Sequence, residues 1–201
     1  MSKQDAQSNF HYSHPGRRVF LSKPDADCET EILDAARRSG DLHHPWVFPP
    51  NNHHEYECYL ERIRGGRTIG FLVRCTSGEG LAGVVNASEP VMGVFRSAYL
   101  GFYAFSGFAA RGYMTEGMSL LLDYAFEELG FHRLEANVQP ANFASSRMVE
   151  RLGFRKEGFS PRYLFIDGAW RDHDRWAILS DEWPAHRERL FASWLAHGRE
   201  S

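Results

Sequence analysis

The chain has 201 residues, 43% of them hydrophobic and 24% charged, which suits one globular domain with a substantial buried core. Its net charge of −3 argues against a surface that coats nucleic acid, and its three widely spaced cysteines imply no disulfide framework. Because it has no long apolar run and no signal-peptide pattern, the sequence predicts neither a membrane span nor secretion, and it favours a cytoplasmic enzyme.

The first part of the chain predicts a tail, a strand and a helix. Residues 1–15 are polar and aperiodic, and we expect a flexible tail there. Residues 17–24 have the pattern of a short strand ended by a proline. Residues 25–39 have the spacing of a helix, which Gly40 stops.

Histidines are concentrated in the proline-rich segment 41–56. The pairs His43–His44 and His53–His54 raise the question of a metal site, because neutral imidazole is a common ligand. Adjacent histidines point apart in most backbones, however, and no cysteine or carboxylate stands at ligand spacing. The sequence therefore favours no metal site here, and it predicts a loop between two helices.

The middle of the chain has the alternation of an antiparallel sheet. A short helix is predicted over residues 55–64. Strands are then predicted over residues 67–75, 81–87 and 98–105, and a hairpin turn joins the first two.

A loop with several small residues, 107–117, leads into the next helix. Apolar residues recur at helical spacing from Met114 to Leu129, and Gly130 stops the helix. The first amides of a helix are unpaired and lie at the positive end of its dipole. This junction therefore predicts a phosphate site, to which Arg111 adds a fixed positive charge.

The last third of the chain continues the alternation of strand and helix. Residues 132–140 are a predicted strand, and Asn142 is a good N-cap for a helix that Gly153 closes. The remaining predicted elements are strands over 154–159, 163–166 and 171–179, and an amphipathic helix over 181–198.

The runs RGYMTEG and HRLEANVQPANFASSRMVERLGFRKEG resemble the core of the GNAT superfamily of acetyl-CoA-dependent N-acetyltransferases. Within it the chain is similar to the Rim-type enzymes, which acetylate the N-terminal α-amine of ribosomal proteins. The run YLFIDGAWRDH marks the alanine-specific branch of those enzymes. The similarity covers roughly residues 17–180.

The resemblance implies an α/β fold of the α+β type. We expect one domain over residues 16–180 with a mixed, mostly antiparallel twisted sheet of about seven strands and about four flanking helices. Residues 181–201 would form a C-terminal helix and tail. The family loop usually reads Gln/Arg-x-x-Gly-x-Gly/Ala, and Ala109 and Met114 depart from it here. Binding of a pyrophosphate would then depend on backbone amides and Arg111.

The same resemblance implies acetyl-CoA as co-substrate and no metal. In the family, the splayed fourth strand offers backbone amides to the thioester. Asn142 would hold the pantetheine arm, and Ser145 would donate a proton to the CoA sulfur unless it merely completes a helix cap. The predicted cofactor-binding residues are Phe102, Tyr103, Ala104, Phe105, Ala110, Arg111, Gly112, Tyr113, Met114, Thr115, Asn142 and Ser145.

Acetyl transfer needs a neutral amine, a polarised carbonyl, a stabilised oxyanion and a proton for the leaving thiolate. An α-amine has a pKa near 8 and a lysine amine about 10.4, so an N-terminus is the easier substrate. Glu135 is the leading candidate for the base, although it could instead pair with Arg133 or Arg155. Glu89 is a rival, and Glu116 either competes or complements the helix dipole.

The expected acceptor wall consists of Trp46, Tyr163, Trp170, Asp172 and His173. Its carboxylate would meet the ammonium end of a peptide, and its aromatic side chains would line a channel. The alternative is that Trp170 packs in the core and that Asp172 and His173 make hairpin hydrogen bonds.

The sequence thus predicts an N-acetyltransferase that modifies a protein N-terminus, with a ribosomal protein as one candidate. A small-molecule amine as acceptor, and a non-catalytic acyl-CoA-binding or ribosome-assembly role, are the alternatives. A polyamine site should gather carboxylates, and the sequence has no acidic cluster. We expect a monomer or homodimer with no nucleic-acid or membrane partner.

Overall fold

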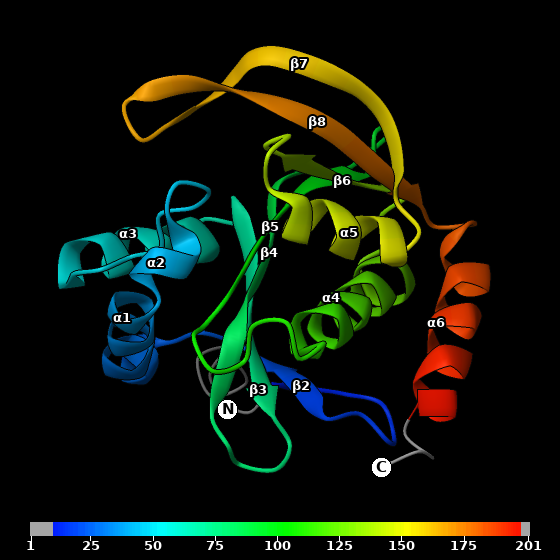
Figure 1. Ribbon diagram of the computed structural model, residues 1–201, viewed down its shortest axis with the longest axis horizontal. Helices are drawn as coiled ribbons and strands as arrows, with labels where there is room; N and C mark the ends of the chain where they lie inside the picture. Colours follow the sequence, from blue (N-terminus) through cyan, green and yellow to red (C-terminus); the bar gives the residue numbers. More distant parts are fainter. Residues whose placement is uncertain (1–9, 198–201) are drawn as a thin grey trace.

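Residues 10–197, the part of the chain that this computed structural model describes, form one eight-stranded sheet with helices on both faces (Figure 1). The strand order is β1-β2-β3-β4-β5-β6-β8-β7, and β5–β6 pairs in parallel while the other neighbours are antiparallel. The predicted mixed, mostly antiparallel sheet is confirmed. The strands are β1 (His11–Tyr12), β2 (Val19–Ser22), β3 (Thr68–Cys75), β4 (Leu81–Val91), β5 (Ser97–Ala104), β6 (Arg133–Val138), β7 (Arg155–Ile166) and β8 (Ala169–Leu179).

Two hydrophobic clusters lie on opposite faces of the sheet. On β3, Leu72 belongs to one cluster while Phe71 and Val73 belong to the other, because successive side chains of a strand point to opposite faces. Both faces are covered, which explains the nearly continuous apolar run of this strand. The helices are α1 (Glu29–Arg38), α2 (Gly40–His43) and α3 (His53–Arg64) on one side, and α4 (Tyr113–Asp123), α5 (Phe143–Arg151) and α6 (Trp183–His197) on the other (Figure 1).

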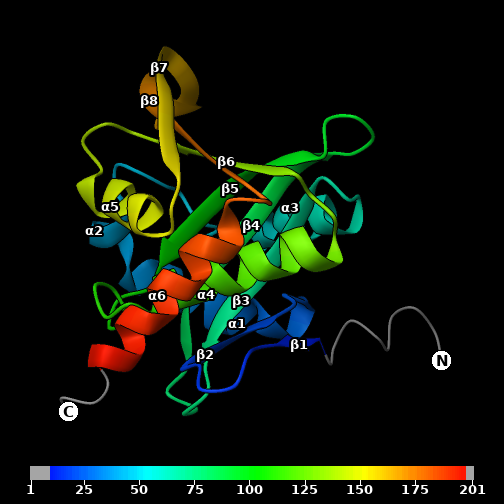
Figure 2. The same ribbon diagram turned by 90° about the vertical axis from the view of Figure 1, so that its right-hand side faces the viewer.

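α4 is the most deeply buried helix, since all of its residues are buried. A side chain at Gly117 would meet Val73 at 2.6 Å, so glycine there lets α4 lie close to β3. α6 lies along the outer side of α4 (Figures 1 and 2). It is fixed there by the buried Trp183, whose Nε1 donates a hydrogen bond of 2.7 Å to Asp123.

The prediction of a tail over residues 1–15 is wrong for residues 10–15, and residues 1–9 lie outside the described part. β1 pairs with β2, and Phe10 and Tyr12 pack against the core, with ring centroids of Phe10 and Phe71 5.3 Å apart. His14 Nε2 adds a hydrogen bond of 3.1 Å with the carboxylate of Asp123. These aromatic contacts hold a segment whose polar composition suggested a tail.

Several boundaries differ from the sequence prediction. α3 begins at His53 because Asn52 caps it, accepting a hydrogen bond of 3.0 Å from the Glu55 N–H. β4 continues to Val91. β7 is a single strand with an irregularity where two strands were predicted. A 3-10 turn, η1 (Ala26–Cys28), precedes α1, and a π-helical turn, η2 (Tyr124–Glu128), extends α4.

The parallel strands β5 and β6 separate partway along the sheet. Their pairing ends at Leu100 with Ala136, whereas β5 stays paired with β4 as far as Ala104 with Gly83. Beyond that point β5 has a free edge. This fork, with α2 near one side and α4 and α5 near the other, positions the site described next (Figure 1).

Candidate active site

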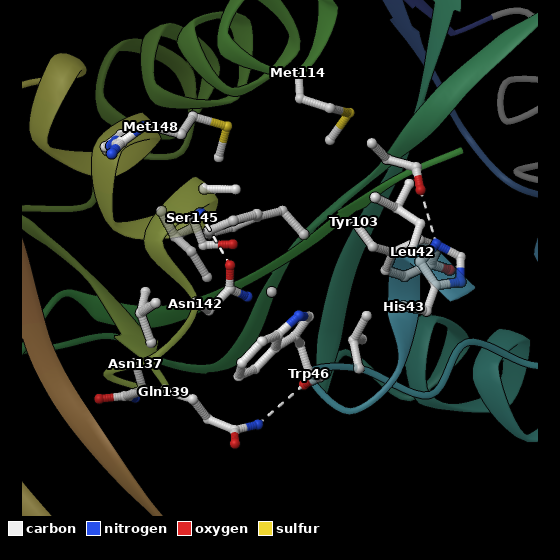
Figure 3. Close-up of a pocket in the computed structure, with 18 of the residues that line it drawn as sticks. Leu42, His43, Trp46, Tyr103, Met114, Asn137, Gln139, Asn142, Ser145 and Met148 are labelled. Carbon is white, nitrogen blue, oxygen red and sulfur yellow. Dashed lines mark hydrogen bonds between the residues drawn. The ribbon is translucent and has the colours of Figure 1, made fainter. Parts of the chain in front are cut away.

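The fork between β5 and β6 opens into a cavity of about 870 Å³ (Figure 3). Its helix half is lined by the loop before α4, the start of α4, and α5. Its hairpin half is lined by Leu42, His43, Trp46 and Val47 and by residues of β5, β6, β7 and β8. Met114 and Met148 project into the helix half, while Trp46 and Gln139 lie in the hairpin half (Figure 3).

The free edge of β5 directs backbone groups into the fork. The Phe105 N–H donates to Ala82 on the β4 side at 2.8 Å, and peptide groups alternate in direction along a strand. The groups of Phe102 and Ala104 therefore face the fork, and the Ala104 carbonyl accepts a hydrogen bond of 2.7 Å from His43 Nε2. Of the predicted run, Phe102, Tyr103 and Ala104 line the cavity. Phe105 does not, because its N–H and its side chain are both used in the core.

The loop before α4 presents backbone amides to the helix half. Gly112 is the N-cap with φ of 84°, a conformation that favours glycine, and it supplies no side-chain cap. Within residues 10–197, the backbone N–H groups of residues 109–115 have no acceptor. Free amides at the positive end of a helix dipole suit an anion. The predicted residues Ala110, Gly112, Met114 and Thr115 line this half of the cavity.

Two predicted cofactor-binding side chains turn away from the cavity. Arg111 folds back on its own loop, and its Nη1 donates to the Gly107 carbonyl at 3.0 Å. The Tyr113 side chain is buried, and its hydroxyl donates to Glu79 at 3.2 Å. Both side chains stabilise the loop, and neither lines the cavity, so these two residues offer it only their backbone amides.

α5 contributes polar groups and positive charge to the helix half. Asn142 Oδ1 accepts a hydrogen bond of 3.1 Å from the Ser145 N–H, which confirms the predicted N-cap. The Ser145 hydroxyl has no partner among the described residues, and it lines the cavity. Arg147 and Arg151, one helical turn apart, also line the cavity and supply the cations that Arg111 does not.

The hairpin half brings together three predicted acceptor residues, Trp46, Tyr163 and His173. Asn137 of β6 and Gln139, which follows β6, join them. Gln139 Nε2 makes a long hydrogen bond of 3.5 Å to the backbone carbonyl of Trp46, which ties β6 to the loop on the other side of the fork (Figure 3).

The hairpin half is nearly free of charge. Burial lowers the pKa of His173 and of His43, so that both are neutral at pH 7. Among the lining residues that the structure describes, the single carboxylate is Glu89, and Arg67 pairs with it at 2.6 Å. At the rim, His44 lies 3.6 Å from Asp167 of the β7–β8 hairpin.

The other two candidate bases lie outside the cavity lining. Glu135 is on the same face of β6 as Asn137, but its carboxylate accepts a hydrogen bond of 2.7 Å from Arg133. Glu116 is buried in the first turn of α4, where Arg18 Nε binds it at 2.6 Å. Both carboxylates are engaged in ion pairs, and this geometry does not support either as the base.

Asp172 and Trp170 likewise do not reach the cavity. Asp172 accepts a hydrogen bond of 2.7 Å from the backbone N–H of Arg162, within the hairpin. Trp170 is 59% exposed and contacts Phe165, with ring centroids 5.5 Å apart. The structure therefore places Asp172 in the hairpin hydrogen bond that was the alternative, and it places Trp170 neither in the cavity lining nor in the core.

The histidine-rich segment does not assemble a metal centre in the part of the chain that is described. No group of three or more His, Cys, Asp or Glu side chains able to hold a metal ion occurs there. His53 pairs with Glu29 at 3.0 Å, and His43 is buried against β5. Over the same residues, the helices are too short or too polar to cross a membrane.

Sequence reasoning missed Asn137, Gln139, Tyr99, Arg147 and Arg151 as lining residues. Strand alternation places Asn137 on the same face as Glu135, but alternation alone does not decide which face lines the cavity. Four-residue spacing places Arg147 and Arg151 on one face of α5. That spacing was the available signal.

The sequence profile of the family described as "Acetyltransferase (GNAT) domain" matches residues 18–155. The chain is 36% identical over 124 residues to the probable N-acetyltransferase YjcK of Bacillus subtilis, covering 62% of this chain and 68% of that protein. It is 37% identical over 107 residues to the [ribosomal protein uS5]-alanine N-acetyltransferase of Escherichia coli. That alignment covers 53% of this chain and little more than half, 55%, of the relative.

Solved structures share the whole fold. RimJ of Mycobacterium smegmatis in complex with CoA-disulfide superposes with a TM-score of 0.79 and 27% identity, covering 92% of this chain and 93% of that one. A spermidine N-acetyltransferase of Vibrio cholerae in complex with CoA and spermine gives a TM-score of 0.70, covering 83% of this chain and 98% of that one. Its 21% identity shows a common fold and no more.

Proposed function

The chain belongs to the GNAT acetyltransferase family and is an acetyl-CoA-dependent N-acetyltransferase, and we propose that its acceptor is the N-terminal α-amine of a protein. The observation that carries this proposal is the nearly uncharged hairpin half of the cavity. Its one described carboxylate, Glu89, is already paired with Arg67. A polyamine carries several positive charges and would need several carboxylates, whereas a chain terminus brings a single amine.

The helix half fits the co-substrate. The free amides of residues 109–115 and the α4 dipole suit the pyrophosphate, and Arg147 and Arg151 offer charge to further phosphate groups. The Ala109 departure from the family pattern removes no backbone donor, since amides do not depend on the side chain. The acyl arm would then lie along the free edge of β5, towards the hairpin half.

The reaction would be direct attack of the amine on the thioester carbonyl. The N–H groups of Phe102 and Ala104 face the fork and would donate to the developing oxyanion. The Ser145 hydroxyl, which has no other partner in the described part, would protonate the leaving thiolate. An α-amine has a pKa near 8, so a substantial fraction is neutral without a strong base.

The shape of the hairpin half also favours a chain terminus. The Gln139–Trp46 and His44–Asp167 contacts bridge the two sides of the fork. An acceptor would therefore enter from an end, as a narrow segment. The relative named as a ribosomal-protein-alanine N-acetyltransferase supports this class of acceptor, and a ribosomal protein is a candidate.

A small-molecule amine remains the alternative acceptor, since a spermidine N-acetyltransferase shares the fold. Thioester consumption should be measured with peptides that begin with alanine or serine, and with a panel that includes spermidine and an amino sugar. We expect turnover with the peptides. Turnover with the small amines and none with the peptides would contradict the proposal, and no turnover with any amine would favour a non-catalytic role.

A further inference from the structure

We propose that Asn137 and His173 together hold the acceptor amine in the hairpin half and that His173 takes up the proton the amine loses. The inference rests on the proposed function and adds a proton acceptor, which the predicted carboxylates do not provide.

The register of the sheet places the two side chains on one face. Asn137 lies opposite Arg175, and His173 lies two residues before Arg175 on β8. Because side chains alternate between faces, Asn137 and His173 are diagonal neighbours on the cavity face. Such neighbours lie about 7–8 Å apart along the backbone, which allows one small group to touch both side chains. Both residues line the cavity.

Asn137 has unused hydrogen-bonding capacity. Its Oδ1 is buried and has no hydrogen-bond partner within residues 10–197. A buried amide oxygen without a donor costs free energy, so a ligand that donates to it would bind favourably. A primary amine is such a donor.

His173 is held in the tautomer that can accept a proton from the cavity. Its Nδ1 lies 3.0 Å from the backbone carbonyl of Arg171, and a carbonyl can only accept. The proton of the neutral ring is therefore on Nδ1, and Nε2 carries the lone pair. The side chain is 2% exposed, and that burial lowers its pKa and keeps it unprotonated at pH 7.

The described neighbours of His173 offer no free carboxylate that could accept the proton in its place. The uncharged Asn137 of β6 and Gln139, which follows β6, line the same cavity as His173. Tyr163 of β7 contacts it, with ring centroids 6.1 Å apart, and burial raises the pKa of the nearby Tyr99 of β5. On its own strand it is flanked by Asp172, bonded to the hairpin backbone, and by Asp174, paired with Lys156.

The step balances in atoms and charge. The amine nitrogen attacks the thioester carbonyl and forms the C–N bond, and the C–S bond breaks. One N–H proton passes to His173 Nε2, which becomes imidazolium and later releases it to solvent. The thiolate takes a proton from water, or from Ser145, which regains one from solvent, and the products are the amide and free CoA. Asn137 keeps the amine oriented by accepting a second N–H hydrogen bond.

The test compares His173→Gln and Asn137→Ala with His54→Gln, which changes an exposed histidine outside the cavity. We expect His173→Gln to lower kcat about 100-fold or more at pH 7, with the acetyl-CoA Kd unchanged by calorimetry. The acidic limb of its kcat–pH profile, measured with saturating acceptor, should also disappear. Asn137→Ala should raise the acceptor KM about tenfold with a smaller effect on kcat. His54→Gln should match the wild type.

A His173→Gln enzyme with kcat within threefold of the wild type, or with an unchanged acidic limb, would overturn the proposal. If that variant does not fold, an unchanged acceptor KM in Asn137→Ala overturns it instead. The assay uses whichever amine the wild type accepts. If the wild type acetylates only small amines, the proposed function is contradicted. If the variants leave the kinetics with the accepted amine unchanged, this inference is contradicted.

Discussion

The carboxylate of Asp172 accepts a hydrogen bond of 2.7 Å from the backbone N–H of Arg162 on the neighbouring strand. Arg162 has φ of 48°, a left-handed conformation that is unfavourable for a residue with a side chain. It lies where the β7–β8 register shifts between Ser160 and Leu164. The extra residues at this bulge place the next side chain, Tyr163, in the cavity. Asp172 therefore acts on the site through the backbone.

Replacing Asp172 should affect the acceptor side of the site indirectly. Asp172→Ala removes the acceptor of the Arg162 N–H, whereas Asp172→Asn keeps an oxygen there. We expect the alanine variant to raise the acceptor KM about threefold to tenfold, matching the loss of one hydrogen bond, and the asparagine variant to stay near the wild type. Equal KM values for the two variants in steady-state assays would mean that the negative charge, not the bulge, is what matters.

The left-handed Gly112 should be required for binding of acetyl-CoA. A Cβ there would come within 3.1 Å of Arg18 Nη2, and the φ of 84° disfavours any side chain. We expect Gly112→Ala to cost about 1 kcal/mol or more of stability and to weaken acetyl-CoA binding measured by calorimetry. Gly66→Ala is the matched control, since Gly66 has φ of 73° in the open turn after α3. It should lose comparable stability and keep its affinity, and an unchanged Kd in Gly112→Ala would move the co-substrate away from this loop.

Ser145→Ala separates the helix cap from the chemistry. The cap uses the Ser145 backbone N–H, so alanine preserves it, and the hydroxyl alone is lost. We expect kcat to fall about tenfold to 100-fold with the acetyl-CoA Kd nearly unchanged, as for a group that acts in the transition state. Ser146→Ala, one residue away and outside the cavity lining, should be neutral. If both variants turn over like the wild type, water protonates the thiolate.

Two tryptophans should differ in their effect on the acceptor. Trp46 lines the hairpin half, whereas Trp170 is largely exposed and contacts Phe165 beyond it. With a short peptide as acceptor, we expect Trp46→Ala to raise KM about tenfold through lost apolar contact, and Trp170→Ala to change it less than twofold. A larger effect of Trp170→Ala would show that the hairpin tip folds over the bound peptide.

The order of strands and helices was predictable because local signals mark it. The apolar spacing of α4, the Asn142 cap and the turn residues after each strand depend on neighbours in the sequence. β1 was not predictable, because its place depends on contacts of Phe10 and Tyr12 with distant rings. Such long-range packing leaves little trace in a short polar segment.

The parts of the site that consist of backbone groups were predictable. The parts that consist of side chains were less so. The free edge of β5 and the amides before α4 follow from the family resemblance and from helix geometry. The directions of Arg111 and Glu135 did not follow, since each has a partner nearer than the cavity, Gly107 for one and Arg133 for the other. Residue type and spacing predict which side chains could bind the cofactor or accept a proton. Tertiary contacts decide which of them are not already bonded to another residue.

The most direct test of the account uses one peptide with an N-terminal alanine, a free α-amine and an internal lysine. After incubation with the enzyme and acetyl-CoA, tandem mass spectrometry locates the added acetyl group. We predict acetylation of the α-amine and none on the lysine, because the α-amine is the more easily deprotonated and the hairpin half admits a chain terminus. Acetylation of the lysine alone, or of spermidine in a parallel reaction with the peptide untouched, would contradict N-terminal acetylation.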